Sequence, residues 1–177
     1  MKKLLSIALA LVMLCSFSIS ALAANTTTLT TTVPAATYTL NIPEDQVIEF
    51  GEEETLINAP TITNASGFAV GKNVRVEFTY EPFTCAEVST TIPYSLSYKN
   101  YDGETYTFPT DAFIFEGNTL GNVGRAYAAH AEKNIPHNAT YHVTNMIIKI
   151  TSTNWGKALA GDYTATITFT AEVVSAS

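Results

Sequence analysis

The chain has 177 residues, with 16 acidic residues against nine basic ones and a formal net charge of −7. A protein this acidic lacks the basic surface that nucleic-acid binding requires, and anionic lipid headgroups do not attract it. We therefore expect neither nucleic acid nor a membrane surface among its partners.

The first 24 residues have the three regions of a secretory signal peptide. Two lysines precede an apolar run from Leu4 to Phe17, and Ala21-Leu22-Ala23 supplies the small residues of a cleavage site. The run is shorter than the about 20 residues of a transmembrane helix. We expect cleavage before Ala24 or Asn25, and a secreted, extracellular protein that is released or held at the cell surface by other proteins. The alternative is a lipoprotein anchored at Cys15, which is disfavoured because Leu14 stands where a small residue is expected.

Cleavage changes both the charge and the cysteine content of the chain. Loss of Lys2 and Lys3 leaves seven basic against 16 acidic residues, a net charge of −9. Cys85 becomes the only cysteine, so no intramolecular disulfide forms. We expect it to be a buried, unreactive thiol in a domain that its core alone stabilises, and about 150 residues suffice for one core.

Residues 35–177 are predicted to form a single domain of short strands. Alternation of apolar and polar residues, with one face packed and the other wetted, is typical of antiparallel sheets. An Asp-Gly pair at 102–103 predicts a hairpin turn. The expected strands cover residues 37–42, 46–50, 59–64, 73–83, 92–100, 111–118, 144–152 and 161–173, with the hairpin signal at 101–108.

The longest alternating stretch, "GDYTATITFTAEV" at residues 161–173, nearly ends the chain. Its apolar side chains, Tyr163, Ala165, Ile167, Phe169, Ala171 and Val173, share one parity, and four threonines and Glu172 take the other. We expect the first set to be buried and this strand to be a central piece of the fold.

One Ala-rich segment interrupts the strands. Val123, Tyr127 and Ala131 recur at helical spacing, and Pro136 follows, so a short helix is predicted over about 123–133. The expected fold class is all-β, a two-sheet antiparallel Ig-like β-sandwich with this one helix.

Residues 25–34, "NTTTLTTTVP", form a Thr-rich leader or the first strand of the fold. One reading is a flexible polar segment. The other is an extended segment that adds to the edge of a sheet in another molecule, with Leu29 and Val33 supplying side chains for pockets. The second reading predicts a homo-oligomer.

The chain carries no recognisable catalytic constellation, and we expect no catalytic residues, no cofactor and no metal. His130, His137 and His142 lie within thirteen residues, but their spacing matches no zinc signature. The acidic stretch "FGEEET" has three consecutive glutamates that point in different directions, so we expect a solvated loop in place of a calcium site.

Exposed aromatic side chains are the remaining candidates for a ligand site. Tyr101 and Tyr106 flank the predicted Asp-Gly turn, and Trp155 precedes the last strand. Trp155 is expected to cap one end of the sandwich, with an exposed ligand contact as the alternative. A carbohydrate-binding module would use these three rings.

Two stretches resemble secreted surface proteins of Gram-positive anaerobes with pilin-like or adhesin-like β-sandwiches. They are "TTTVPAATYTLNIPEDQVIEFGEEETLI" and "NWGKALAGDYTATITFTAEV", of which the second is also similar to the last strand of spore-coat and fimbrial subunits. The resemblance implies a non-enzymatic structural or adhesion protein whose partners are its own copies, other surface proteins or glycans. A small-ligand, carbohydrate-binding module is the alternative.

Overall fold

The computed structural model describes residues 30–31, 35–117, 125–131, 133–137 and 142–176. The chain divides into two units, Met1–Thr32 and Val33–Ser177, and the fold below is that of the second unit. The expected signal peptide and the predicted contacts Leu29 and Val33 lie outside the described residues.

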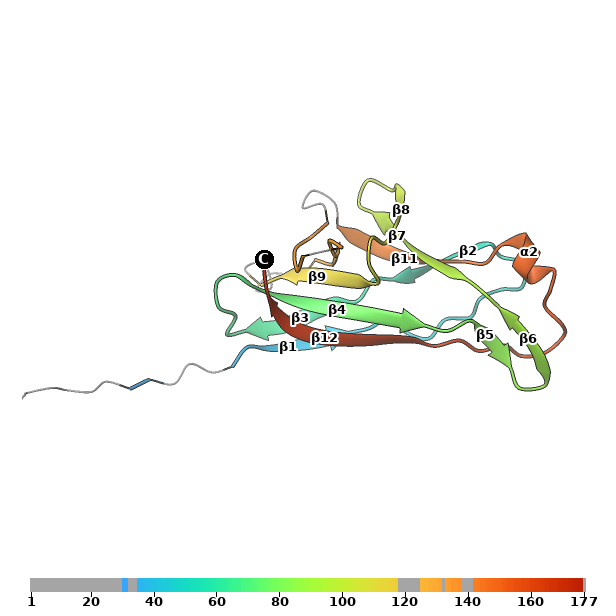
Figure 1. The fold of residues 1–177 in the computed structure, drawn as a ribbon, viewed down its shortest axis with the longest axis horizontal. Helices are drawn as coiled ribbons and strands as arrows, with labels where there is room; N and C mark the ends of the chain where they lie inside the picture. The colour runs from blue at the N-terminus through green and yellow to red at the C-terminus, as the bar shows by residue number, and fades with distance from the viewer. Residues whose placement is uncertain (1–29, 32–34, 118–124, 132, 138–141, 177) are drawn as a thin grey trace, which may run out of the picture. The chain divides into compact units, whose positions relative to one another are not determined.

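Two four-stranded sheets make up most of the domain, one in the order β10-β9-β4-β12 and the other β2-β11-β7-β8 (Figure 1). Two further pairs, β1-β3 and β5-β6, complete it, and all pairings between these strands are antiparallel. The strands are β1 (Thr37–Asn41), β2 (Glu54–Asn58), β3 (Thr61–Ser66), β4 (Lys72–Tyr80), β5 (Phe83–Cys85), β6 (Val88–Ile92), β7 (Ser95–Asn100), β8 (Thr105–Thr107), β9 (Ala112–Glu116), β10 (Tyr127–Ala128), β11 (Val143–Lys149) and β12 (Ile167–Ser175), with one short helix, α2 (Ser152–Trp155).

One hydrophobic core lies between the two sheets, as alternation predicts. β4 contributes Val74, Val76 and Phe78, while Met146 and Ile148 come from β11 of the other sheet. Of their polar neighbours, Glu77 and Thr79 are exposed and Arg75 is half-buried. The expected all-β sandwich is confirmed, as are the burial of Cys85 and the β7-β8 hairpin around Asp102-Gly103.

The predicted helix at 123–133 is wrong for the residues that the structure describes. Tyr127 and Ala128 instead form β10, paired with Ile114 and Phe113 of β9. The residues from Ala126 to Ala129 are all buried, a continuous pattern that a strand covered on both faces shows and an amphipathic helix does not. Helix propensity of alanine is a weak preference that the unpaired edge of β9 overrides.

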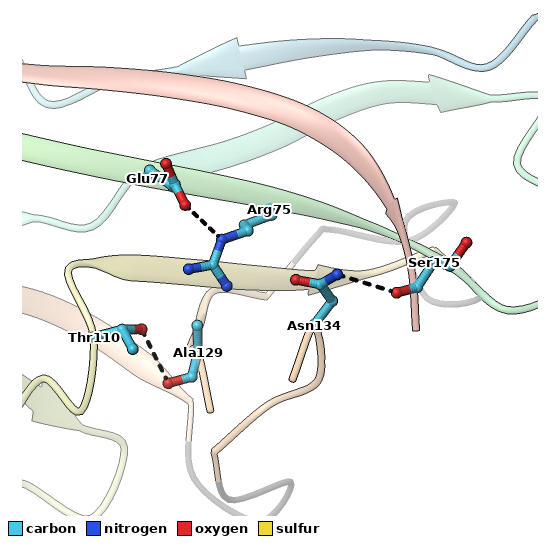
Figure 2. Close-up of polar contacts among 6 residues, drawn as sticks. All are labelled: Arg75, Glu77, Thr110, Ala129, Asn134 and Ser175. Carbon is cyan, nitrogen blue, oxygen red and sulfur yellow. Dashed lines mark hydrogen bonds and ion pairs between the residues drawn. The ribbon is translucent and has the colours of Figure 1, made fainter. Parts of the chain in front are cut away.

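Polar contacts hold the segment after β10 against the other strands of its own sheet (Figure 2). Thr110 donates its hydroxyl to the Ala129 carbonyl at 3.3 Å, and the Asn134 amide donates to the Ser175 carbonyl at 3.3 Å. Asn73, a buried residue of β4, donates to the Asn134 carbonyl at 2.8 Å. These contacts fix the C-terminal end of β12 through side chains.

Two strand predictions, for residues 161–173 and 46–50, need correction. Although its alternation predicts a central strand, β12 is an edge strand, because among the described strands it pairs with β4 alone. Residues 46–50 form no strand, although "QVIEF" predicts one. Pro43 lacks a backbone donor, and Glu44, Asp45 and Glu49 are exposed, so this segment stays solvated outside the ladders.

Candidate functional site

The two tyrosines predicted to bind a ligand flank one hairpin, but each ring is stacked on a neighbour. Tyr101 is 55% exposed and lies parallel to the His142 ring, with ring centroids 5.4 Å apart. Tyr106 is 37% exposed and stacks on the buried Tyr98 at 5.7 Å. One face of each ring is thus covered within the domain.

Trp155 lies at the other end of the same sheet. β11 runs from Val143, beside Asn100, to Lys149, beside Ser95, and α2 follows it, whereas Tyr101 follows Asn100. The indole Nε1–H of Trp155 donates to the Glu52 carbonyl at 2.9 Å. Its ring packs against the core and meets Phe50 edge-on at 5.3 Å. Trp155 therefore caps one end of the sandwich, and the structure does not bring the three predicted rings into one platform.

The three histidines do not meet at one place. His130 and His137 lie side by side with ring centroids 5.6 Å apart, while His142 stacks on Tyr101. Burial, and secondarily the neighbouring Arg125, lowers the pKa of His142. Within the described ranges, no three His, Cys, Asp or Glu side chains are grouped so that they could hold a metal ion.

The open edge of β12 is the most distinctive feature of the fold. Glu81 N–H donates to the Thr166 carbonyl and Ala176 N–H donates to the Gly71 carbonyl, at 3.4 and 2.9 Å. With the continuous register between β12 and β4, these bonds show that even-numbered residues direct their backbone groups to β4. The N–H and C=O groups of Ile167, Phe169, Ala171 and Val173 therefore point to the opposite edge, with which no described strand pairs.

Proteins usually protect such an edge with proline, lysine, a bulge or a short strand. β12 is nine residues long, contains neither proline nor lysine, and keeps one register with β4 throughout. Glu172 is its only charged residue. On the inward parity, Ile167, Phe169 and Ala171 are half-buried, whereas Val173 is 42% exposed. This edge therefore retains the features that allow another strand to pair with it.

A groove runs beside this edge, and we call it the β12 groove. One wall is the segment Ile42–Ile48, the other is Ala165–Phe169, and the floor is formed by Ile57, Phe83, Tyr94 and Ile148. The floor is apolar because all four of these side chains belong to the hydrophobic core or pack against it. Among the hydrogen bonds between described residues, none ties Ile42–Ile48 to either sheet. The wall opposite β12 therefore rests on side-chain packing alone.

Sequence reasoning missed this groove. Its walls lie more than 100 positions apart in the chain, and periodicity reports only neighbours along one strand. The one available signal was the predicted strand at 46–50, an apolar stretch between Pro43 and the acidic loop for which no pairing partner was apparent.

The burial of Tyr94 in the floor of the groove can be tested through the pH dependence of stability. Burial, with contributions from Tyr80 and Glu81, raises the pKa of the Tyr94 hydroxyl to about 12. Between pH 10 and 12 the folded chain keeps this proton while an unfolded chain releases it, so the free energy of unfolding falls as the pH rises through this range. We expect urea denaturation at pH 9 and pH 11 to show a smaller loss for Tyr94→Phe than for the unaltered chain. Tyr101→Phe, which alters an exposed ring, serves as the control, and an equal loss for all three proteins would contradict the assigned burial.

Comparison with known proteins adds no assignment: no family model matches the chain, and no curated protein or solved structure matches it. None of the helices in the described part of the chain has the length and apolar character needed to cross a membrane.

Proposed function

We propose that this chain is a secreted or cell-surface structural or adhesion protein, without enzymatic activity, that associates with other chains by strand addition. The observation that carries this proposal is the open, regular, nine-residue edge of β12. Strand addition requires a row of unpaired backbone donors and acceptors, together with neighbouring pockets for alternate side chains. The edge supplies the first and the β12 groove the second.

The acceptor edge is tested by a proline that removes one of its donors. The Ala171 N–H points away from β4, so Ala171→Pro leaves the β4–β12 ladder intact while it interrupts the free edge. We expect a folded protein whose concentration-dependent association, measured by light scattering on the mature chain, is at least tenfold weaker. Circular dichroism establishes the fold of the variant, and Val173→Pro, at the more exposed end of the same edge, repeats the test.

Thr170→Pro is the matched control, because the Thr170 N–H faces Glu77 of β4. This substitution removes a ladder bond, and we therefore expect it to lower the free energy of unfolding more than Ala171→Pro does. An unaltered chain that stays monomeric at every concentration would overturn the proposal. Folded Ala171→Pro and Val173→Pro proteins that associate as strongly as the unaltered chain would overturn it equally.

A further inference from the structure

We propose that the β12 groove receives the leader, residues 25–34, of a second copy of this chain, with Leu29 and Val33 turned toward the groove floor. The inference rests on the proposed function, strand addition at the edge of β12, and it names the partner. Four observations support it: the spacing of the apolar leader residues, the composition of its other face, its charge, and the reach of the chain.

The spacing of Leu29 and Val33 matches the length of the groove. Residues four apart in an extended strand point to the same side and lie about 13 Å apart. The wall of the groove formed by β12 and the residues just before it runs from Ala165 to Phe169, which is also an interval of four residues. A leader paired along this wall therefore places one apolar side chain toward each end of the floor.

The opposite face of the leader matches the outward face of the strand beside it. When Leu29 and Val33 point inward, the outward residues from 26 to 32 are all threonines, Thr26, Thr28, Thr30 and Thr32, and Pro34 ends the series. The outward residues beside the groove, Thr164, Thr166 and Thr168, are threonines as well, and all three are exposed. Threonine pairs on adjacent strands stabilise a sheet through side-chain contacts, so the added strand would continue the composition of this outward face.

Charge favours this segment over other parts of the chain as the occupant. Residues 24–43 contain no Asp, Glu, Lys or Arg, although the mature chain has a net charge of −9. Glu44 and Asp45 belong to the wall of the groove and are exposed. An acidic segment would be repelled there, whereas the leader brings no charge that would need to be desolvated.

The reach of the chain favours a leader from another copy. Two residues, 35 and 36, separate the leader from β1, and the groove begins at Ile42, directly after β1 ends. A leader that folded back along its own β1 would use about five residues to cover the about 16 Å of that strand. Val33 would then lie beside β1 and could not occupy the groove together with Leu29. The leader of a second copy is not tied to this β1, so both Leu29 and Val33 can reach the groove.

Entry of a strand has a low cost within the acceptor. Because hydrogen bonds between described residues leave Ile42–Ile48 untied to either sheet, this wall moves outward without breaking a backbone ladder. The incoming strand, running antiparallel to β12, gains the donors and acceptors of Ile167 and Phe169 and, where it extends beyond the groove, those of Ala171. Its two apolar side chains cover the core residues of the floor.

The experiment compares two pairs of substitutions in the mature chain. Leu29→Asp with Val33→Asp puts charge on the side that faces the groove, and Thr28→Asp with Thr32→Asp puts the same charge on the solvent side. We expect the first variant to be monomeric, with association at least a hundredfold weaker, and the second to associate within tenfold of the unaltered chain. Equal loss in the two variants, or association retained in both, would overturn the leader as the inserted strand.

Mixing two variants tests whether the leader of one copy pairs with the β12 edge of another copy. The Leu29→Asp, Val33→Asp chain keeps an intact edge, and the Ala171→Pro chain keeps an intact leader. We expect each to be monomeric alone and the two together to form a 1:1 dimer that grows no further, as native mass spectrometry can show. Absence of the dimer would overturn the inference.

If Ala171→Pro abolishes association while the leader variants retain it, strand addition at β12 stands and another segment is the donor. If neither the leader variants nor Ala171→Pro weakens association, both the inference and the proposed function are overturned.

Discussion

Phe78→Ala is expected to lower the free energy of unfolding by about 3–5 kcal/mol, the range for a fully buried phenylalanine. Phe78 is 2% exposed and lies in β4, one of the two central strands of its sheet. Its ring meets Phe108, Phe113 and Phe169 at centroid separations of 5.0, 5.4 and 6.3 Å. Truncation leaves a cavity among three rigid rings, and such rings cannot collapse fully into the space.

The matched control is Phe50→Ala, the same chemical change at a side chain that is 79% exposed. Phe50 meets only the edge of Trp155 among the ring contacts of the described residues, so we expect a loss of about 1 kcal/mol. Urea denaturation measures both changes, and at about 2–4 °C per kcal/mol the melting temperature should fall by about 6–20 °C for Phe78→Ala. Equal losses at the two positions would contradict the core assignment.

The alternation of side chains predicted which faces are buried, and the structure shows why it predicted little more. In β4 and β7, apolar residues such as Val76, Phe78 and Leu96 point into the core as expected. The same alternation in β12 did not reveal that the strand lies at an edge. One buried face is required of edge and central strands alike, and the number of pairing partners depends on segments far away in the chain.

The Ala-rich segment failed as a prediction for a related reason. Alanine favours a helix when the backbone has no other partner, but it also fits between two packed layers. Ala126 and Ala128 belong to the main core, whereas Ala129 packs with Ala112 and Ile114 in a second cluster. The small side chains therefore serve a strand that is covered on both faces. Local propensity contains no information about the free edge of β9 that this strand pairs with.

The candidate site was predictable in part only. The leader, with Leu29 and Val33, could be recognised as a β-prone segment because that property is local. Its proposed acceptor could not, since the β12 groove unites Ile42–Ile48 with Ala165–Phe169 over a floor drawn from β2, β5, β11 and the segment before β7. The exposed tyrosines illustrate the reverse case: Tyr101 is exposed as predicted, but its stacking on His142 arises from a tertiary contact.

Gly117→Ala is expected to destabilise the domain by about 2–4 kcal/mol, the cost of overpacking together with the loss of a hydrogen bond. Gly117 follows β9, and its N–H donates to the Lys72 carbonyl at 3.1 Å and to the Asn73 Oδ1 at 3.2 Å. A Cβ at this position would overlap the Lys72 carbonyl oxygen and lie 3.0 Å from the carbonyl carbon. Both atoms belong to the backbone of β4, so relief requires the two central strands of the sheet to separate locally.

Gly51→Ala separates this steric effect from the conformational cost of replacing a glycine. Gly51 has a φ of +86°, and no atom lies within 4 Å of a Cβ built there. The only cost is the left-handed backbone conformation, about 1–2 kcal/mol for an L-residue. We expect urea denaturation to show the larger loss for Gly117→Ala. Since Lys72 and Asn73 pair with Ser175 and Val174 of β12, we also expect hydrogen exchange to quicken at the C-terminal end of that strand in Gly117→Ala alone. Unchanged exchange there would mean that the sheet absorbs the added methyl group without moving β4.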